Sequence, residues 1–296
     1  MHICRFKTSW ALFVAIVLMA AGRPIIAQAV EGNVVYYNQG AGAAAETSFP
    51  FQVLRLALSK CGKTYQLKPS PIGKADSDRA ASAMQADGPI DVQWIPERLS
   101  DDAKMLPVLF PVDRGLLGYR LFLIDGARQG EFDQIKSLTD LKAKVALQGA
   151  GWADVAILRS ADLQVRTAPL YPDLFRMTVG GRADYFPRGA FEAYNEVAQW
   201  GPATPGLAVE QGLILHYPLA TIFYVKKTDK VLADDLLRGL VTAFNDGSYT
   251  ALFSNNADVK MVVDHAHMKS RRTIEIDNPF MSPAMKATDS RYWYRP

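Results

Sequence analysis

The chain has 296 residues, 49% of them hydrophobic and 21% charged, so it can bury a sizeable core and wholesale disorder is excluded. Thirty-three basic residues stand against 30 acidic ones, a balance that gives little support to a nucleic-acid-binding face. Two cysteines are too few for a disulfide scaffold.

Residues 1–29 are typical of a cleaved secretory signal. Arg5 and Lys7 precede an unbroken apolar run, Trp10–Ala21, and Ala27 and Ala29 supply the small residues that a signal peptidase requires. The run is shorter than the roughly 20 apolar residues that a membrane helix needs. We therefore expect cleavage near Ala29 and a soluble, unlipidated protein in the periplasm. An uncleaved N-terminal anchor is the alternative.

Cleavage would make the mature chain electrically neutral. It removes three of the 33 basic residues and no acidic one, which leaves 30 of each sign. Nucleic acid and anionic membranes are then not expected as partners. Only Cys61 would remain, so the fold must hold by its core without an intramolecular disulfide.

The next segments alternate between strand and helix patterns, which favours parallel strands in an α/β architecture. We expect strands at 34–38, 65–68 and 90–95. We expect one helix between Ser48 and Gly62, and a second that begins at Asp76 or Ser77 and ends at Gly88.

A long strand pattern at 118–124 and a polar loop at 125–131 precede a second α/β unit. Its expected strands are 144–148, 163–166, 183–186, 213–216 and 221–225, and its expected helices are 153–159, 171–178, 190–199 and 233–244. The last 20 or so residues have no clear period, and we expect their aromatic side chains to pack on the body.

Motifs for common cofactors and metals are missing. Gly40 and Gly42 follow the first strand with the wrong spacing for a dinucleotide loop, and there is no Walker loop or nucleophile elbow. His265 and His267 have no cysteine or third histidine nearby, so a solvated pair is favoured over a metal clip. We expect no cofactor and no metal, and the sequence does not support an enzyme.

Four segments, in this order along the chain, resemble bacterial extracellular solute-binding proteins of family 3. They are a helix with the strand and turn DGPIDVQWIPER at 76–98, an opening SLTDLKAKVALQGAGWADVAILRSADLQV at 137–165, LFRMTVGGRADYF at 174–186 and LADDLLRGLVTAFNDGSYTALF at 232–253. The resemblance implies the type 2 periplasmic-binding fold, an α/β fold of two lobes joined by two crossing strands that serve as a hinge.

The resemblance also implies a division of the chain. Residues 30–124 would form the first part of lobe 1 and end with the first crossing strand, and residues 125–219 would form lobe 2. Residues 220–296 would contain the second crossing strand, the return to lobe 1 and the C-terminal tail. Such proteins close on a small ligand by a hinge motion, here around 118–124 and 220–225.

Site residues follow from the same resemblance. Arg98 lies where the family's turn arginine grips a ligand carboxylate, for which a guanidinium fork is suited. Trp94 would form a wall of the cleft. The alternatives are a surface arginine that caps a helix and a core tryptophan.

The loop before the helix at 153–159 matches a ligand-binding loop of the family. Gly149 and Gly151 would offer backbone N–H groups to an anion at the helix start. Ala150 and Gly151 stand where the family usually has a hydroxyl, so that donor is missing. Trp152 would stack on the ligand or cover it, or else pack inward.

Arg188 stands near the position where the family often has an aspartate that pairs with an amino-acid ammonium. This reversal favours an anionic or carboxylate-bearing ligand over an ordinary α-amino acid, unless Arg188 is a solvated loop residue. Tyr36 and Asn38 end the first strand at the cleft edge. Arg120 among apolar neighbours needs a partner, either the ligand or an acid across the hinge.

We therefore interpret the chain as a monomeric, non-catalytic periplasmic solute-binding protein that captures a small polar molecule. Its partner would be an inner-membrane ABC transporter or a sensor. One alternative is a dehydratase-like enzyme on the same fold, with Glu97 or Asp184 as acid or base. The other is a sensory or interaction module without a ligand, which would use the aromatic tail.

Overall fold

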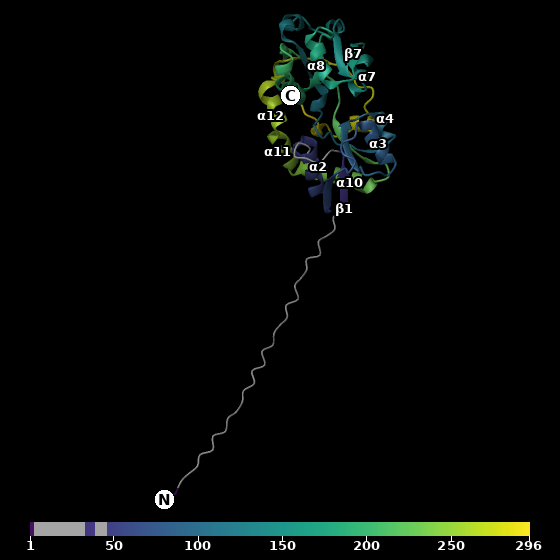
Figure 1. Cartoon of the computed structure of the whole chain (residues 1–296), viewed down its shortest axis with the longest axis vertical. Coiled ribbons are helices and arrows are strands. Elements are labelled where there is room, and N and C mark those ends of the chain that lie inside the picture. Colours follow the sequence, from purple (N-terminus) through teal and green to yellow (C-terminus); the bar gives the residue numbers. More distant parts are fainter. Residues whose placement is uncertain (3–32, 39–45) are drawn as a thin grey trace. The chain divides into compact units, whose positions relative to one another are not determined.

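The computed structural model describes residues 1–2, 33–38 and 46–296. Residues 3–29 of the expected signal segment and the Gly40–Gly42 loop lie outside these residues. Residues 1–31 and 32–296 form separate units, and the account below concerns the second (Figure 1). In the described part of the chain, every helix is too short or too polar to cross a bilayer.

The first lobe is built on a five-stranded sheet with the order β2-β1-β3-β11-β4. Its strands are β1 (Asn33–Tyr37), β2 (Tyr65–Pro69), β3 (Val92–Pro96), β4 (Met105–Val108) and β11 (Thr221–Lys226). β1 runs parallel to β2 and β3, whereas β11 runs antiparallel to β3 and β4. The helices of this lobe are α2 (Phe49–Lys60), α3 (Ser77–Gln85), α4 (Leu99–Asp102), α10 (Lys230–Asn245), α11 (Ser248–Asn255) and α13 (Pro283–Lys286).

The second lobe contains a sheet with the order β12-β10-β5-β8, in which β9 also pairs with β5. Its strands are β5 (Tyr119–Asp125), β8 (Phe186–Gly189), β9 (Leu207–Val209), β10 (Leu213–His216) and β12 (Arg272–Glu275). Beside it lies the parallel pair β6 (Val145–Gly149) and β7 (Gln164–Ala168). The helices are α5 (Gln129–Phe132), α6 (Leu138–Leu141), α7 (Ala153–Ser160), α8 (Tyr171–Val179), α9 (Ala190–Trp200) and α12 (Ala257–His265).

The expected α/β fold of two lobes is confirmed, with one refinement at the hinge. β5 and β11, expected as crossing strands, each lie within the sheet of one lobe. The chain passes between the lobes in the segments just before them, 111–118 and 217–220. These segments lie together, because Tyr217 N donates to Gly118 O (3.2 Å) and a Cβ on Gly118 would collide with the Tyr217 carbonyl oxygen.

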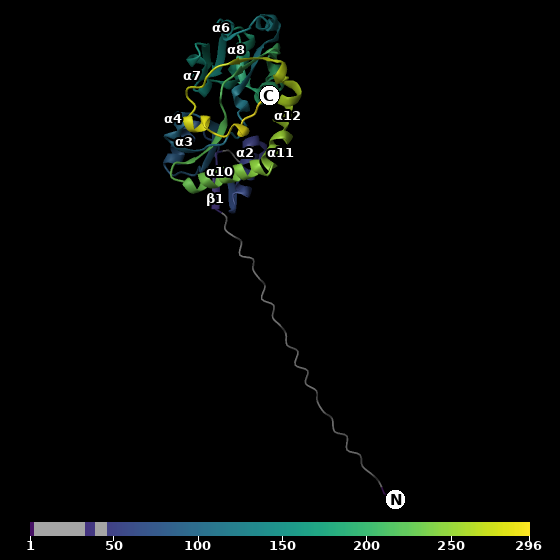
Figure 2. The same ribbon diagram turned by 180° about the vertical axis from the view of Figure 1, so that it is seen from behind.

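The C-terminal segment differs from the expected return to lobe 1. α12 packs on α9 of the second lobe, where Asn195 Nδ2 donates to Asp258 Oδ1 (2.8 Å). β12 then pairs with β10 in the second sheet. Figure 2 shows the yellow C-terminal segment running from there back to the first lobe, where Ser282 N donates to Glu97 Oε1 (3.0 Å). The chain therefore connects the two lobes four times.

The aromatic tail packs on the body, as expected. The Tyr292 ring lies 4.6 Å from that of Phe110 and 4.8 Å from that of Phe244, between centroids. The Trp293 ring covers Gly115, a residue with φ +76° that has no room for a Cβ. These contacts place the end of the chain on the first crossing segment.

Candidate functional site

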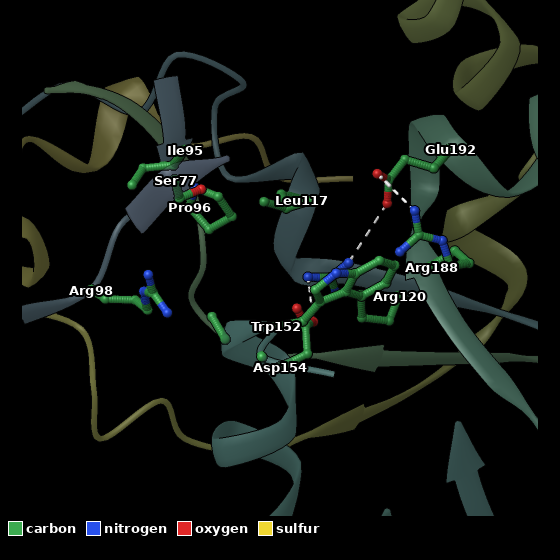
Figure 3. A pocket seen from close by; sticks show the side chains of 12 residues that line it. Ser77, Ile95, Pro96, Arg98, Leu117, Arg120, Trp152, Asp154, Arg188 and Glu192 are labelled. Carbon is green, nitrogen blue, oxygen red and sulfur yellow. Dashed lines mark ion pairs between the residues drawn. The ribbon is translucent and has the colours of Figure 1, made fainter. Parts of the chain in front are cut away.

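The interlobe cleft contains a cavity of about 290 Å³. The first lobe contributes the end of β3 and the turn into α4, and the second contributes β5, β8 and the starts of α7 and α9 (Figure 3). The lining residues are Ser77, Ile95, Pro96, Arg98, Leu117, Arg120, Gly151, Trp152, Ala153, Asp154, Arg188 and Glu192.

Arg98 is the charged residue that the first lobe contributes to the lining of this cavity. It precedes α4 in an extended conformation, which turns its side chain out of the strand and into the cleft. Its Nε donates to Asp101 Oδ2 (2.8 Å), and its side chain is 29% exposed. Among the residues that the structure describes, no acceptor occupies its two terminal nitrogens. A carboxylate in the cleft can therefore bind the guanidinium without breaking the Asp101 pair.

Arg120 lies across the cavity from Arg98, on β5, with 2% of its side chain exposed (Figure 3). Its guanidinium pairs with Asp154 (2.5 Å) and more distantly with Glu192 (3.8 Å). Tyr217 also donates its hydroxyl to Asp154. Burial is the largest single influence on the pKa of Arg120 and lowers it, but Asp154, Tyr217 and Glu192 together outweigh burial, so the pKa is raised. Its Nε is buried without a partner in the described part of the chain.

Arg188 is held still more firmly. Its Nε and Nη2 both donate to the Glu196 carboxylate (2.8 Å and 2.6 Å), and Nη2 also pairs with Glu192 (3.0 Å). The guanidinium lies 4.9 Å from the centroid of the Trp152 ring and 5.0 Å from that of Phe186. Such cation–π contacts fix the plane of the guanidinium as well as its position.

The cleft does not have the excess positive charge that the sequence suggested. Arg98, Arg120 and Arg188 are matched by Asp101, Asp154, Glu192 and Glu196. Arg188 therefore does not by itself call for an anionic ligand, because the protein supplies its carboxylate partners.

Five of the predicted site residues line the cavity, namely Arg98, Arg120, Gly151, Trp152 and Arg188. Gly149 does not line it; the Trp152 indole lies directly on Gly149, where a Cβ would collide with the ring. Gly149 thus positions Trp152. The loop's backbone is also partly used internally, because Ala150 N donates to Ala168 O (2.9 Å) and Trp152 N to Gly149 O (3.2 Å).

Three other predicted site residues lie elsewhere. Asn38 is buried, and its side-chain amide exchanges hydrogen bonds with the backbone of Ala75 (3.0 Å and 2.9 Å). Trp94 packs against the rings of Tyr37 and Phe223 and faces a neighbouring cavity. Tyr36 is a strand residue whose N–H donates to Asp91 Oδ2 (2.8 Å) and is not among the cleft's lining residues.

Two acidic residues of the cleft, Asp154 and Glu192, were missed by the sequence analysis. Asp154 follows Trp152 in the first turn of α7, where a carboxylate is stabilised by the helix start. Glu192 accepts the N–H of Gly189 (2.9 Å) at the start of α9. The spacing Arg188, Glu192, Glu196 is a signal that could have indicated an ion-pair row.

The two residues considered for acid–base catalysis are engaged elsewhere. Glu97 is fully buried, and its carboxylate accepts the Ser282 N–H (3.0 Å). Asp184 pairs with Arg128 (2.6 Å) and accepts the N–H of Val145 (2.6 Å). Neither carboxylate lines the 290 Å³ cavity, although Glu97 and Arg98 both line a neighbouring cavity of about 470 Å³.

Comparison with known proteins gives a structural likeness only, since no family model and no curated protein matches the chain. An ancestral arginine-binding protein bound to arginine superposes with a TM-score of 0.52 at 18% identity, over 76% of this chain and 97% of that one. An ancestral amino acid-binding protein, a precursor of cyclohexadienyl dehydratase, gives 0.53 at 17% identity, over 76% and 95%.

A histidine kinase sensor domain with similarity to periplasmic binding proteins gives a TM-score of 0.51 at 17% identity, over 77% of this chain and 96% of that one. At these identities the likeness shows the fold. The chain therefore has the two-lobed architecture of periplasmic-binding proteins.

Proposed function

We propose that this chain is a periplasmic solute-binding protein that captures a small, polar, carboxylate-bearing molecule between its lobes. The observation that supports the proposal most directly is Arg98, which faces the interlobe cavity with both terminal nitrogens free of acceptors from the described residues. The fold supports it as well, because ligand sites are generally found at such domain interfaces.

The charge balance of the cleft narrows the class of ligand that it can bind. A carboxylate at Arg98 would face Glu192 and Asp154 on the opposite wall, whose oxygens accept hydrogen bonds. A ligand that also carries a hydroxyl or ammonium group can donate hydrogen bonds to these carboxylates while its own carboxylate binds Arg98. A compact dianion would instead be repelled by them. The proposed ligand is therefore a carboxylate with a donor group, such as a hydroxy or amino acid.

We propose that residues up to about 118 and from about 220 form most of lobe 1, and that lobe movement pivots where Gly118 and Tyr217 touch. Delivery to an inner-membrane transporter or to a sensor is the role proposed for the closed form. The likeness to a kinase sensor domain supports the second route. We propose a monomer, with the N-terminal segment removed on export.

The test begins with mass spectrometry of small molecules released from the purified protein by mild denaturation. Calorimetric titration of the identified ligand then compares wild type, Arg98→Ala and, as a matched control, Arg55→Ala on the exposed face of α2. We expect Arg98→Ala to lose a charge-assisted hydrogen bond and to weaken binding roughly tenfold to a hundredfold. Wild-type affinity in that variant, or a ligand without a carboxylate, contradicts the proposal.

A further inference from the structure

A second cavity, of about 250 Å³, lies beside the charged one. We call it the apolar chamber, and its walls include Phe49, Trp94, Leu116, Phe191, Phe253 and Val259. These residues come from both lobes. Phe191 and Val259 belong to α9 and α12 of the second lobe, whereas α2, β3 and α11 of the first lobe contribute Phe49, Trp94 and Phe253. The chamber therefore lies where residues of both lobes pack against the hydrophobic core of the first lobe.

The chamber adjoins the charged cavity directly. Ile95 and Pro96 line both cavities. Consecutive residues face one cavity each: Leu116 the chamber and Leu117 the charged cavity, and likewise Phe191 and Glu192. The side chains at the end of β3 thus form the shared boundary of the two cavities, and a molecule held by Arg98 would lie next to the chamber.

Polar groups at the chamber's edge are already bonded within the protein. The Asp113 carboxylate accepts the N–H groups of Gly115 (2.9 Å) and Thr221 (3.1 Å). Asn256 Oδ1 accepts the N–H of Asp258 (2.9 Å) and of Val259 (3.2 Å). A polar ligand group entering the chamber would lose its water contacts with little return, whereas an apolar group gains by leaving water.

We propose that the chamber receives an apolar, ring-sized arm of the ligand whose carboxylate binds Arg98. The inference rests on the proposed function and narrows its ligand class to carboxylates with an aromatic or branched aliphatic substituent. The size agrees, because an apolar protein cavity of about 150 Å³ already accommodates benzene. The aromatic walls also offer edge-to-face contacts to a ring.

The experiment uses two pairs of probes that share a head group: propanoate with 3-phenylpropanoate, and L-alanine with L-phenylalanine. Calorimetry on the mature chain should show each ring-bearing probe binding roughly tenfold to a hundredfold more tightly than its partner, as expected for burial of one apolar side chain. The heat-capacity change of binding should be more negative for the ring-bearing probe.

Two valines of α12 give a matched pair of variants. Val259→Phe fills the chamber, and Val263→Phe places the same ring one turn further on, at a position that is 61% exposed. We expect Val259→Phe to abolish the advantage of the ring-bearing probes while leaving propanoate and alanine unaffected. Val263→Phe should behave as wild type. If Val259→Phe does not fold, Phe191→Ala supplies the test, since it removes a ring contact and should reduce the same advantage.

The outcomes separate the two proposals. Probes that bind through Arg98 but gain nothing from the ring, or a ring advantage that survives Val259→Phe and Phe191→Ala, overturn the chamber inference alone. If none of the four probes binds, the proposed carboxylate site fails and the chamber inference fails with it.

Discussion

The two walls of the cleft use arginine in opposite ways. The first lobe presents Arg98, whose side chain is 29% exposed and whose single acid contact leaves its terminal nitrogens available. The second lobe presents Arg120 and Arg188, whose side chains are 2% and 7% exposed and bind two carboxylates each. The residue type and the cleft are the same, but one wall keeps terminal nitrogens free, whereas the arginines of the other wall are paired with the protein's own carboxylates.

Burial explains this difference. A guanidinium removed from water needs acidic partners nearby, and once it has them a ligand must compete for them. Arg120 and Arg188 therefore serve chiefly to hold β5, β8 and α9 in register, with Glu192 bridging the two. Arg98, at the mouth of a turn, retains enough water contact to exchange water for a ligand.

The largest effect on the free energy of unfolding should come from removing Arg120, one of the two buried arginines of the second lobe. Arg120→Ala leaves Asp154 buried with only Tyr217 as a side-chain partner, and the loss of one partner of a buried pair costs about 3–5 kcal/mol. Urea unfolding of the variant measures the free energy of unfolding. The double variant Arg120→Ala/Asp154→Ala should recover part of that loss, because it leaves no unpaired carboxylate. A loss below about 1 kcal/mol in the single variant would show that the pair is not structural.

Asp113 is a buried carboxylate that is held by backbone N–H groups and not by an arginine, so it can be compared with the acids of the second wall. Burial raises the pKa of Asp113 from 3.8 to about 6, and its hydrogen bonds from Thr221 and Gly115 oppose that rise. The folded state thus holds the proton more tightly than the unfolded chain. The stability that Asp113 contributes is complete below about pH 4 and is lost as the pH rises through 6, by about 3 kcal/mol.

Asp113→Asn isolates this contribution. The difference in free energy of unfolding between wild type and variant should shift by about 2.5 kcal/mol against wild type from pH 4 to pH 7. Denaturant titrations at the two pH values measure it. A difference that is constant with pH would mean that the carboxylate is charged throughout.

Glu97 and Arg98 are neighbours in sequence with different roles on the same wall. Glu97→Ala removes the acceptor of the buried Ser282 N–H, an unsatisfied donor that costs about 1–3 kcal/mol. Glu97→Gln keeps an acceptor oxygen and should lose less. Ligand affinity should change little in Glu97→Gln if its role is to anchor the C-terminal segment. A large affinity loss with unchanged stability would instead place Glu97 in the ligand site.

The features of the fold that could be predicted from the sequence are those that depend on local patterns. The amphipathic face Val53, Leu54, Ala57, Leu58 and the apolar run of β5 indicate helix and strand without tertiary information. The order of such segments, with the family resemblance, predicted two lobes. The place of Arg98 in the cleft lining followed from the position of its turn, which is likewise local.

Features that depend on distant partners could not be predicted. β12 pairs with β10 although residues 217–271 lie between them, and nothing in the four residues of β12 distinguishes that sheet from the first. Arg188 was interpreted as a free charge because the row Glu192 and Glu196 gains meaning only once α9 follows β8 directly. The sequence gives the charge of each residue, but the net charge of a site depends on which residues the fold brings together.

The smallest expected effect on stability is that of Arg98→Lys, a variant that tests whether the ligand needs the shape of the guanidinium or only its positive charge. Arg98→Lys keeps a cation that can still pair with Asp101, so the free energy of unfolding should change by less than about 1 kcal/mol, as for most partly exposed ion pairs. The ammonium cannot reproduce the guanidinium fork, however, and ligand affinity should fall by about tenfold. Calorimetry and denaturation of Arg98→Lys, with Arg55→Lys on α2 as control, measure both quantities. Undiminished affinity would mean that the ligand senses only the positive charge of this wall, and a large stability loss would make Arg98 structural, like the arginines that it faces.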